Sequence, residues 1–401
     1  MVPGGEEKIE QGTLLFYRLN LALFIAGFIT FSTLYDFQPL LPMLVTDFNV
    51  SPAFGSLALS VATFSLALTL PVSGSISDAL GRRSMMMTAV VATSLLALAT
   101  AVCRSMELLI VLRLLQGVAL AGVPAVAMAY LNEELSPRAV GKAMGLYIAG
   151  NAIGGMTGRI LTACLADYLP WRGAIGVIGV VSLVLAVAFL FLIPPSRHFR
   201  RTPFRITPLT RSLFGHLAKP QLLCLFAVSF TGMGAFVTLY NYVTFRLLAP
   251  PYLLSQSQVA FIFLSYALGA LGSGLMGAAV DRFGRKTTLL AALVIMGCGA
   301  CLTLLHPLVA VISGIAVFTL GFFGAHTVAS TWVGFLATSS RAQASSLYLF
   351  AYYLGSSVSG TGGGFFWSGW GWPGVILLVL FLICLALSST LLLNRLSRQG
   401  G

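Results

Sequence analysis

Four ionisable residues lie inside strongly apolar stretches of this chain: Asp36, Arg113, Arg159 and His326. An ionisable side chain at bilayer depth costs on the order of 3 kcal/mol or more, so such residues are commonly paired or functional. Asp36 is the carboxylate among them and ends the first apolar stretch. A buried carboxyl group beside a cation can be poised to take up and release a proton. The four residues are therefore candidates for proton coupling.

Each of these residues also has a structural interpretation. Asp36 can cap the loop that follows it, and Arg113 can hold the first and fourth apolar stretches together as an ion pair. Arg159 can reach the outer interface or pair with Asp167. A lone histidine such as His326 is more often a hydrogen-bonded packing group than a proton carrier. If the functional interpretation holds, Asp36, Arg113 and Arg159 are expected to form one buried cluster.

The composition is that of an integral membrane protein. Of the 401 residues, 58% are hydrophobic and 8% are charged, whereas soluble domains carry about 25% charged residues. The net charge of +12 follows membrane topology and forms no stripe suited to nucleic acid. All six cysteines lie outside hydrophilic loops, and the C-x-x-C of Cys298 and Cys301 is expected to be buried in an apolar helix. We therefore expect no disulfide, metal site or cofactor.

Twelve apolar stretches are long enough to cross a bilayer, which takes about 20 residues each, and backbone groups in hydrocarbon favour helices. Eighteen of the 23 Lys and Arg residues then fall on one side, which predicts that both termini are cytoplasmic. The chain is expected to divide into 1–194, a cytoplasmic linker 195–219, and 220–401. The predicted spans are 14–40, 53–76, 85–103, 108–131, 142–166, 173–194, 220–247, 257–279, 287–304, 309–334, 344–366 and 373–393.

One short basic loop occurs twice, 203 residues apart. The first copy is G-S-I-S-D-A-L-G-R-R from Gly74 to Arg83, and the second is G-A-A-V-D-R-F-G-R-K from Gly277 to Lys286. A single repeat at half the chain length indicates two related halves, which in transporters move about a central site. The glycines permit close helix approach and a tight turn. The expected conformational latch comprises Gly74, Asp78, Gly81, Arg82, Arg83, Glu133, Arg138, Gly277, Asp281, Gly284, Arg285 and Lys286; a solvated basic anchor is the alternative.

The chain resembles the major facilitator superfamily. The shared features are twelve spans, a long central loop and the motif G-x-x-x-D-x-x-G-R-[RK] in two equivalent loops. R-L-L-Q-G from Arg113 is similar to its fourth-span motif, and G-L-Y-I-A-G-N-A-I-G-G from Gly145 is similar to the motif of its drug:proton antiporters. The resemblance implies two pseudo-symmetric six-helix bundles and a loop that clamps the cytoplasmic side. The chain departs from the pattern at Ala79, often Arg in the family, and at Asn151, usually Pro. Independently, Gly150, Gly154, Gly155 and Gly158 permit close packing against a neighbouring helix.

Aromatic and amide side chains are the candidates for a substrate cavity. Rings suit flat apolar or cationic ligands through stacking and cation–π contact, while sugars would call for more amides than the chain offers. Asn241 occupies the position equivalent to Asp36 in the second half. The candidate cavity residues are Tyr35, Gln38, Gln116, Asn151, Tyr240, Asn241, Tyr348 and Tyr352.

These patterns predict a proton-coupled transporter in a bacterial inner membrane that exports small apolar or cationic compounds. The expected partners are a small-molecule substrate, protons and lipid. The protein is expected to be a monomer. A carrier for sugars or small metabolites and a passive facilitator are the alternatives within transport. An integral-membrane enzyme is disfavoured, because the sequence has no motif for hydrolysis or ATP coupling. A non-transporting sensor is disfavoured too, because it would usually have soluble segments longer than this linker.

Overall fold

The computed structural model describes residues 8–199, 201–202, 206–337 and 340–399. These residues are helical almost throughout, and their only extended pairing is an isolated bridge between Ile9 and Leu135. The helices are α1 (Leu14–Tyr35), η1 (Gln38–Leu40), α2 (Leu41–Asp47), α3 (Pro52–Leu80), α4 (Arg82–Ala101), α5 (Met106–Leu120), α6 (Pro124–Glu134), α7 (Pro137–Ala166), α8 (Trp171–Leu192), α9 (Ile206–Leu217), α10 (Pro220–Leu248), α11 (Gln256–Ala260), η2 (Phe261–Ser265), α12 (Tyr266–Leu302), α13 (Leu308–Leu336) and α14 (Arg341–Gln399).

Nine helical stretches among the described residues are long and apolar enough to cross a membrane. Two of them are each a pair of helices joined at a glycine, because α12 breaks at Gly284 and α14 at Gly371. The helix α7 adds a further crossing of 30 residues with a more polar sequence. Together these make the twelve predicted spans, although α1 ends at Tyr35 and the first predicted span ran on to residue 40.

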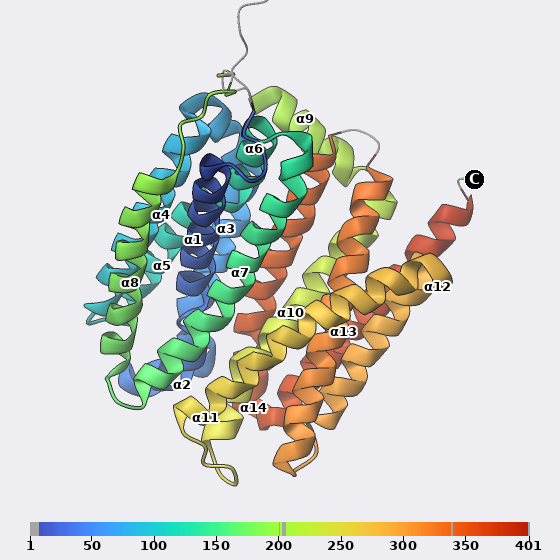
Figure 1. Cartoon of the computed structure of the whole chain (residues 1–401). Helices are drawn as coiled ribbons and strands as arrows, with labels where there is room; N and C mark the ends of the chain where they lie inside the picture. The colour runs from blue at the N-terminus through green and yellow to red at the C-terminus, as the bar shows by residue number, and fades with distance from the viewer. Residues whose placement is uncertain (1–7, 200, 203–205, 338–339, 400–401) are drawn as a thin grey trace, which may run out of the picture.

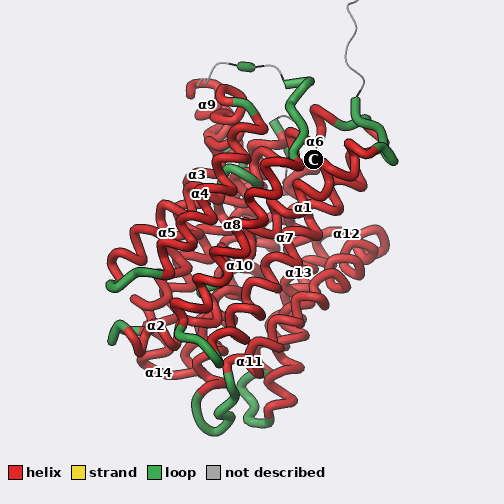
Figure 2. Tube along the Cα trace, turned by 60° about the vertical axis from the view of Figure 1, so that its left-hand side comes forward, coloured by secondary structure: helices red, strands yellow, loops and turns green. Residues whose placement is uncertain are grey.

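The helices form two groups that lie side by side (Figure 1). Helices α1 to α8 make the first group, in which α1 packs on α7, α4 on α8 and α3 on α5. Helices α10 to α14 make the second, in which α10 packs on α14 and α12 on α13. The main contact between the groups is α3 against α14. The view in Figure 2 shows that helices run nearly the full length of the molecule, with loops gathered at its two ends.

The two ends of the molecule are distinguished by their loops. One end carries α6, α9 and the Gly74–Arg83 loop, and we call it the motif end (Figure 1). The other end carries α2 and α11, and we call it the opposite end. The repeated loop has the same backbone turn in both copies, since Gly81 has a φ of 103° and Gly284 a φ of 76°. Only glycine adopts such values without strain, which confirms the predicted tight turn.

A row of glycines lets α7 pack directly on the backbone of α1. A Cβ atom at Gly150, Gly154 or Gly158 would lie 2.4–2.6 Å from the backbone of Phe24, Phe28 or Ser32 respectively. The spacing of four residues keeps these glycines on one helix face. This confirms close packing at all three positions, whereas Gly155 faces the Arg159 side chain. The second group repeats the arrangement, because a Cβ at Gly355 of α14 would lie 2.0 Å from Phe230 O of α10.

Two expectations about local packing are wrong. A Cβ at Gly74 or Gly277 would meet no atom within 4 Å, so these glycines mediate no close helix approach in this conformation. Cys298 and Cys301 are exposed rather than buried. Both cysteines lie in an apolar part of α12, and an apolar helix does not bury every side chain that it carries.

The glycine row predicts that two Gly→Ala substitutions in α7 change the midpoint of thermal unfolding in different directions. Gly154→Ala should lower the midpoint of thermal unfolding in detergent, because the added methyl group overlaps the carbonyl of Phe28 at a cost of about 1–3 kcal/mol. Gly145→Ala, also in α7, is the matched control because its Cβ meets no atom within 4 Å. The control should keep or raise the midpoint, since Ala favours a helix over Gly by about 0.5–1 kcal/mol. Equal midpoints for the two variants would contradict the packing described.

Candidate functional site

Arg113 is a fully buried cation that joins three helices. Its Nε donates to the carbonyl of Ala58 at 2.6 Å, its Nη1 to that of Thr33 at 2.8 Å and its Nη2 to that of Leu34 at 2.7 Å. Nη1 also donates to Oε1 of Gln116 at 2.6 Å. The last carbonyls of a helix have no partner within it, so Arg113 completes the hydrogen bonding at the end of α1. Four neutral acceptors therefore hold the guanidinium in place.

Asp36 lies directly after α1 and faces Arg113. Its Oδ1 is 3.6 Å from Nη1 of Arg113, and the side chains are 1% and 0% exposed. Neither carboxylate oxygen accepts a hydrogen bond from the described residues. A buried carboxylate without a donor is costly, so the charged form of Asp36 depends on Arg113 at a distance longer than a hydrogen bond. A proton on Asp36 would remove that cost without breaking any hydrogen bond of Arg113.

Arg159 forms a second site beside this pair. Its Nε donates to Oε1 of Gln38 at 2.6 Å, and its guanidinium lies 3.9 Å from the ring centroid of Tyr35. The same guanidinium lies 4.7 Å from the ring of Tyr266, in the second group. The expected single cluster is therefore wrong in detail: Asp36 pairs with Arg113, while Arg159 stacks on aromatic rings from both groups.

Two further contacts tie the groups together at the opposite end. Nε2 of Gln38 donates to Oδ1 of Asn241 at 2.8 Å. The carboxylate of Asp167, at the end of α7, accepts the backbone N–H groups of Gln256 and Ser257 at 2.9 and 3.0 Å, and the hydroxyl of Ser257. Asp167 thus binds the start of α11. The alternative interpretation of Arg159, a pair with Asp167, is therefore wrong. We call the contacts of Arg159, Gln38 and Asp167 with the second group the seam.

His326 lines a cavity inside the second group. The cavity measures about 10 Å³, close to the space that one water needs, and its lining includes Phe322, Tyr348 and Tyr352. The hydroxyl of Tyr348 lies 3.1 Å from Nδ1 of His326, and the ring of Tyr352 lies 5.0 Å from the imidazole. Three residues expected at the site are thus gathered in one aromatic pocket.

Other candidate cavity residues lie elsewhere. Tyr240 is fully buried, and its hydroxyl lies 2.5 Å from that of Ser265 and 2.7 Å from that of Thr319, so it packs inside the second group. Gln116 is buried beside Arg113. Asn151 does not face the cavity: its amide oxygen would lie 2.2 Å from a Cβ at Gly27 of α1. These three side chains support helix packing in this conformation.

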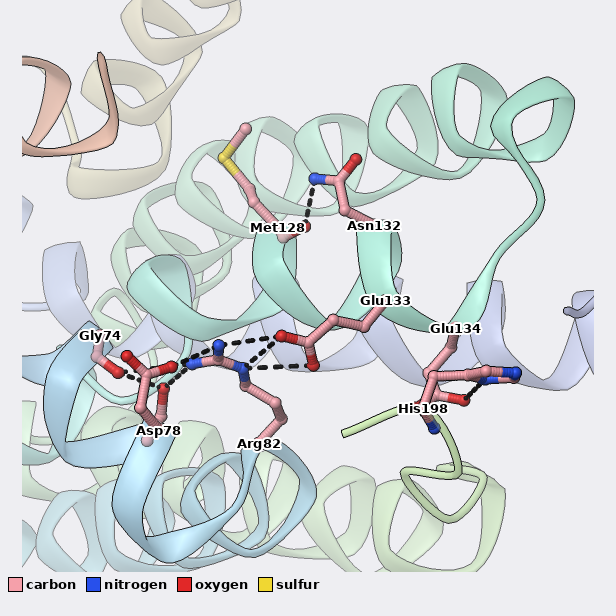
Figure 3. Close-up of polar contacts among 9 residues, drawn as sticks. Gly74, Asp78, Arg82, Met128, Asn132, Glu133, Glu134 and His198 are labelled. Carbon is pink, nitrogen blue, oxygen red and sulfur yellow. Dashed lines mark hydrogen bonds and ion pairs between the residues drawn. The ribbon is translucent and has the colours of Figure 1, made fainter. Parts of the chain in front are cut away.

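The first copy of the repeated loop is a charged cluster at the motif end (Figure 3). The Arg82 guanidinium forms ion pairs with Asp78 and with Glu133 of α6, the latter at 2.9 Å. It also donates to Ser77 Oγ and to the carbonyl of Gly74. Glu133 and Arg82, both members of the expected latch, are therefore paired. Arg83 instead donates to the carbonyl of Ile193 at 3.3 Å; Arg138 is exposed and has no ion pair within the described chain.

The second copy lacks this cluster. Asp281 is exposed and has no ion pair among the residues that the structure describes. The guanidinium of Arg285 lies 4.0 Å from the ring centroid of Phe335, and Lys286 is half-buried. At the repeat offset of 203, Glu133 corresponds to Leu336, so the second half has no acid at that position. The two latches predicted from the repeat are therefore unequal.

Sequence reasoning missed several residues of this region. Phe263 and Tyr266 stack near Arg159, and Phe236 has its ring centroid 3.9 Å from that of Phe322. Their aromatic character was visible in the sequence, but aromatic residues are frequent in every span. Only the fold shows which rings face the seam.

Comparison with known proteins identifies the class that this fold and site define. The sequence profile of the Major Facilitator Superfamily matches residues 23–249 and 234–400. The chain is 47% identical over 379 residues to the transporter YybF of Bacillus subtilis (strain 168), covering 94% of each protein. It is 43% identical over 379 residues to the inner membrane transport protein YnfM of Escherichia coli (strain K12), covering 94% of this chain and 91% of that protein.

A solved structure gives the same fold. A bacterial homologue of the human lysosomal transporter Spinster, in an inward-facing and unoccupied conformation, superposes with a TM-score of 0.77 at 16% identity, covering 96% of this chain and 98% of that one. The fold and the buried charges define a multi-pass membrane transporter of two helical bundles. The chain belongs to the Major Facilitator Superfamily, and it is a transporter and not an enzyme, as the sequence predicted.

The Asp167 contact generates a prediction about closure of the opposite end. Partial burial raises the pKa of Asp167, but the hydrogen bonds from Ser257 and Gln256 lower it by more, so the net pKa lies below its ordinary value. A carboxylate with a lowered pKa stabilises the bonded state above its ordinary pKa, and this contribution is lost as the pH falls through the lowered value. The contact should therefore persist unchanged from about pH 5 to 8.

Asp167→Asn should loosen this end at all of those pH values. Ser60→Cys, a buried reporter on α3 within 3.6 Å of a Cβ placed at Gly360, should then react faster with a soluble maleimide. Asp47→Asn is the matched control, because Asp47 bonds Trp171 and Arg172 within the first group. Equal labelling rates in the two variants would contradict a closing role for Asp167.

Proposed function

We propose that this transporter exports small compounds with a flat apolar body by alternating access, in exchange for protons. Asp36 is the proposed proton site, and the observation that carries this is its environment. The carboxylate is buried, lacks a hydrogen-bond donor in the described chain and lies 3.6 Å from Arg113. Because Arg113 is held by neutral acceptors, Asp36 can change its charge while the surrounding helices stay packed.

The aromatic rings around His326 support the proposed cargo, although the cavity that they line holds about one water in this conformation. Ring faces of Phe322, Tyr348 and Tyr352 favour flat apolar groups by stacking, and cations by cation–π contact. The sequence predicted apolar or cationic cargo, but the described spans offer a cation no free carboxylate, because Asp36 faces Arg113. An apolar cargo is therefore better supported than a cationic one. Sugar efflux has less support, since the amides of Gln38 and Asn241 bond each other.

The proposed mechanism is a rocking of the two groups about the central site. We propose that the motif end is cytoplasmic, in the inner membrane of a bacterium, and that the protein works as a monomer with both termini inside. The seam closes the opposite end in this structure, so the conformation would be inward-facing. The ion pairs of Arg82 with Asp78 and Glu133 are proposed to hold the motif end of the first group rigid while the groups move.

Proton release tests this function. Purified protein in weakly buffered detergent should release protons when flat aromatic dyes are added, and little when sugars are added. Asp36→Asn should abolish the release, because the amide cannot exchange a proton, while dye binding measured by fluorescence persists. His326→Gln removes a titratable group inside the second group, away from Asp36, and should leave the proton release unchanged.

Two outcomes would contradict the proposal. Dye binding without proton release in the unmodified protein would exclude exchange and favour a facilitator. Release that survives Asp36→Asn and disappears in His326→Gln would move the proton site into the aromatic pocket.

A further inference from the structure

Arg159 is a buried cation that no acidic residue neutralises. It is 2% exposed, and it donates hydrogen bonds to the Gln38 amide oxygen at 2.6 Å and to the Gly155 carbonyl at 2.5 Å. Within the described parts of the chain no carboxylate lies at ion-pair distance from it. Asp36 faces Arg113, and Asp167 is bonded to the start of α11. The three charges Asp36, Arg113 and Arg159 therefore sum to one positive charge.

The surroundings of Arg159 are aromatic. Its guanidinium lies 3.9 Å from the ring centroid of Tyr35, 4.7 Å from that of Tyr266 and 5.6 Å from that of Phe263. Ring faces attract a cation but carry no net charge, so they offset only part of the cost of burying it. Arg159 lies seven residues before the end of α7, which places it about 10 Å inside that end. A charge at such a depth usually marks a path for substrate or ions.

The cage around Arg159 is divided between the two groups. Tyr35 and Gln38 belong to the first group with Arg159, while Phe263 and Tyr266 belong to the second. If the groups separate at the opposite end, Phe263 and Tyr266 leave and one face of the guanidinium opens to the central space. Tyr35 and Gln38 move with Arg159 and keep it oriented. A planar guanidinium held in this way suits a carboxylate, which it can bind through two parallel hydrogen bonds.

We propose that Arg159 binds the carboxylate group of an aromatic cargo when the two groups separate at the opposite end. This inference rests on the proposed transport function and specifies the charge of its cargo as anionic. The cargo carboxylate takes the place of the departing rings and neutralises the guanidinium, while the aromatic body lies against Tyr35. The alternative is that Arg159 only joins the groups at the seam, in which case it confers stability and no preference for charge.

The test uses sets of probes that differ in charge and little else. Benzoate, benzamide and benzamidinium share one shape with charges of −1, 0 and +1, and the corresponding naphthyl and biphenyl compounds extend the body. Binding to the purified full-length protein is measured by the change in tryptophan fluorescence and by the thermal shift. The unmodified protein should bind the best carboxylate about tenfold or more tightly than its amide, since a charge-assisted hydrogen bond is worth about a factor of ten or more.

Three variants locate the preference. Arg159→Gln should bind carboxylate and amide within about threefold of each other, with amide affinity unchanged. Arg159→Lys should keep part of the preference, because the charge remains but the planar fork is lost. Arg104→Gln is the matched control, since Arg104 is exposed and its loss changes the net charge equally. The control should behave like the unmodified protein.

Several outcomes overturn the inference. A preference for the amidinium, no difference between carboxylate and amide, or no binding of any carboxylate would each contradict it. A preference that persists in Arg159→Gln would also do so, and a lowered unfolding midpoint without a change in preference would support the seam role alone. Failure of proton exchange is separable from these results, because the preference for carboxylate over amide is measured by binding at fixed pH and involves no proton signal.

Discussion

The hydrogen bonds of Arg113 are the interaction on which the rest of the site depends. The guanidinium binds the last carbonyls of α1, a carbonyl of α3 and the side chain of Gln116 on its own helix. It fixes where α1 ends, and it thereby fixes the positions of Asp36 and Gln38, which follow that end. Because the acceptors are neutral, this arrangement is independent of the charge on Asp36. The proposed proton exchange at Asp36 would therefore leave the local fold intact.

The same end of α1 connects the proton site to the seam. Asp36 faces Arg113 inside the first group, and two residues later Gln38 bonds both Arg159 and Asn241 of the second group. A short rigid segment thus touches the proposed proton site and the contact between the groups. At the motif end, Arg82 connects α3 and α6 within the first group alone. In the proposed mechanism the first group moves as a rigid body, and the contacts of the seam change at the opposite end.

The sequence predicted the twelve-span fold, because hydrophobic length and the loop repeat are local features. It also singled out the buried charges, since few residue types are costly in apolar stretches. It predicted the glycine contacts of α7 but not the open surroundings of Gly74, because a small residue permits close approach without requiring it. The division of Arg113 and Arg159 into separate sites, and the cage of Phe263 and Tyr266, depend on how the two groups meet. That is a long-range property, and no spacing within one segment reports it.

The most direct test of this account is an infrared titration of the Asp36 carboxyl group in the purified protein. The difference spectrum between unmodified protein and Asp36→Asn isolates the band of a protonated carboxyl group. The account predicts that this band is present in the free protein at mildly acid pH and disappears when an aromatic cargo binds and the proton is released. A carboxyl band that is absent throughout, or that stays unchanged on cargo binding, would contradict proton exchange at Asp36.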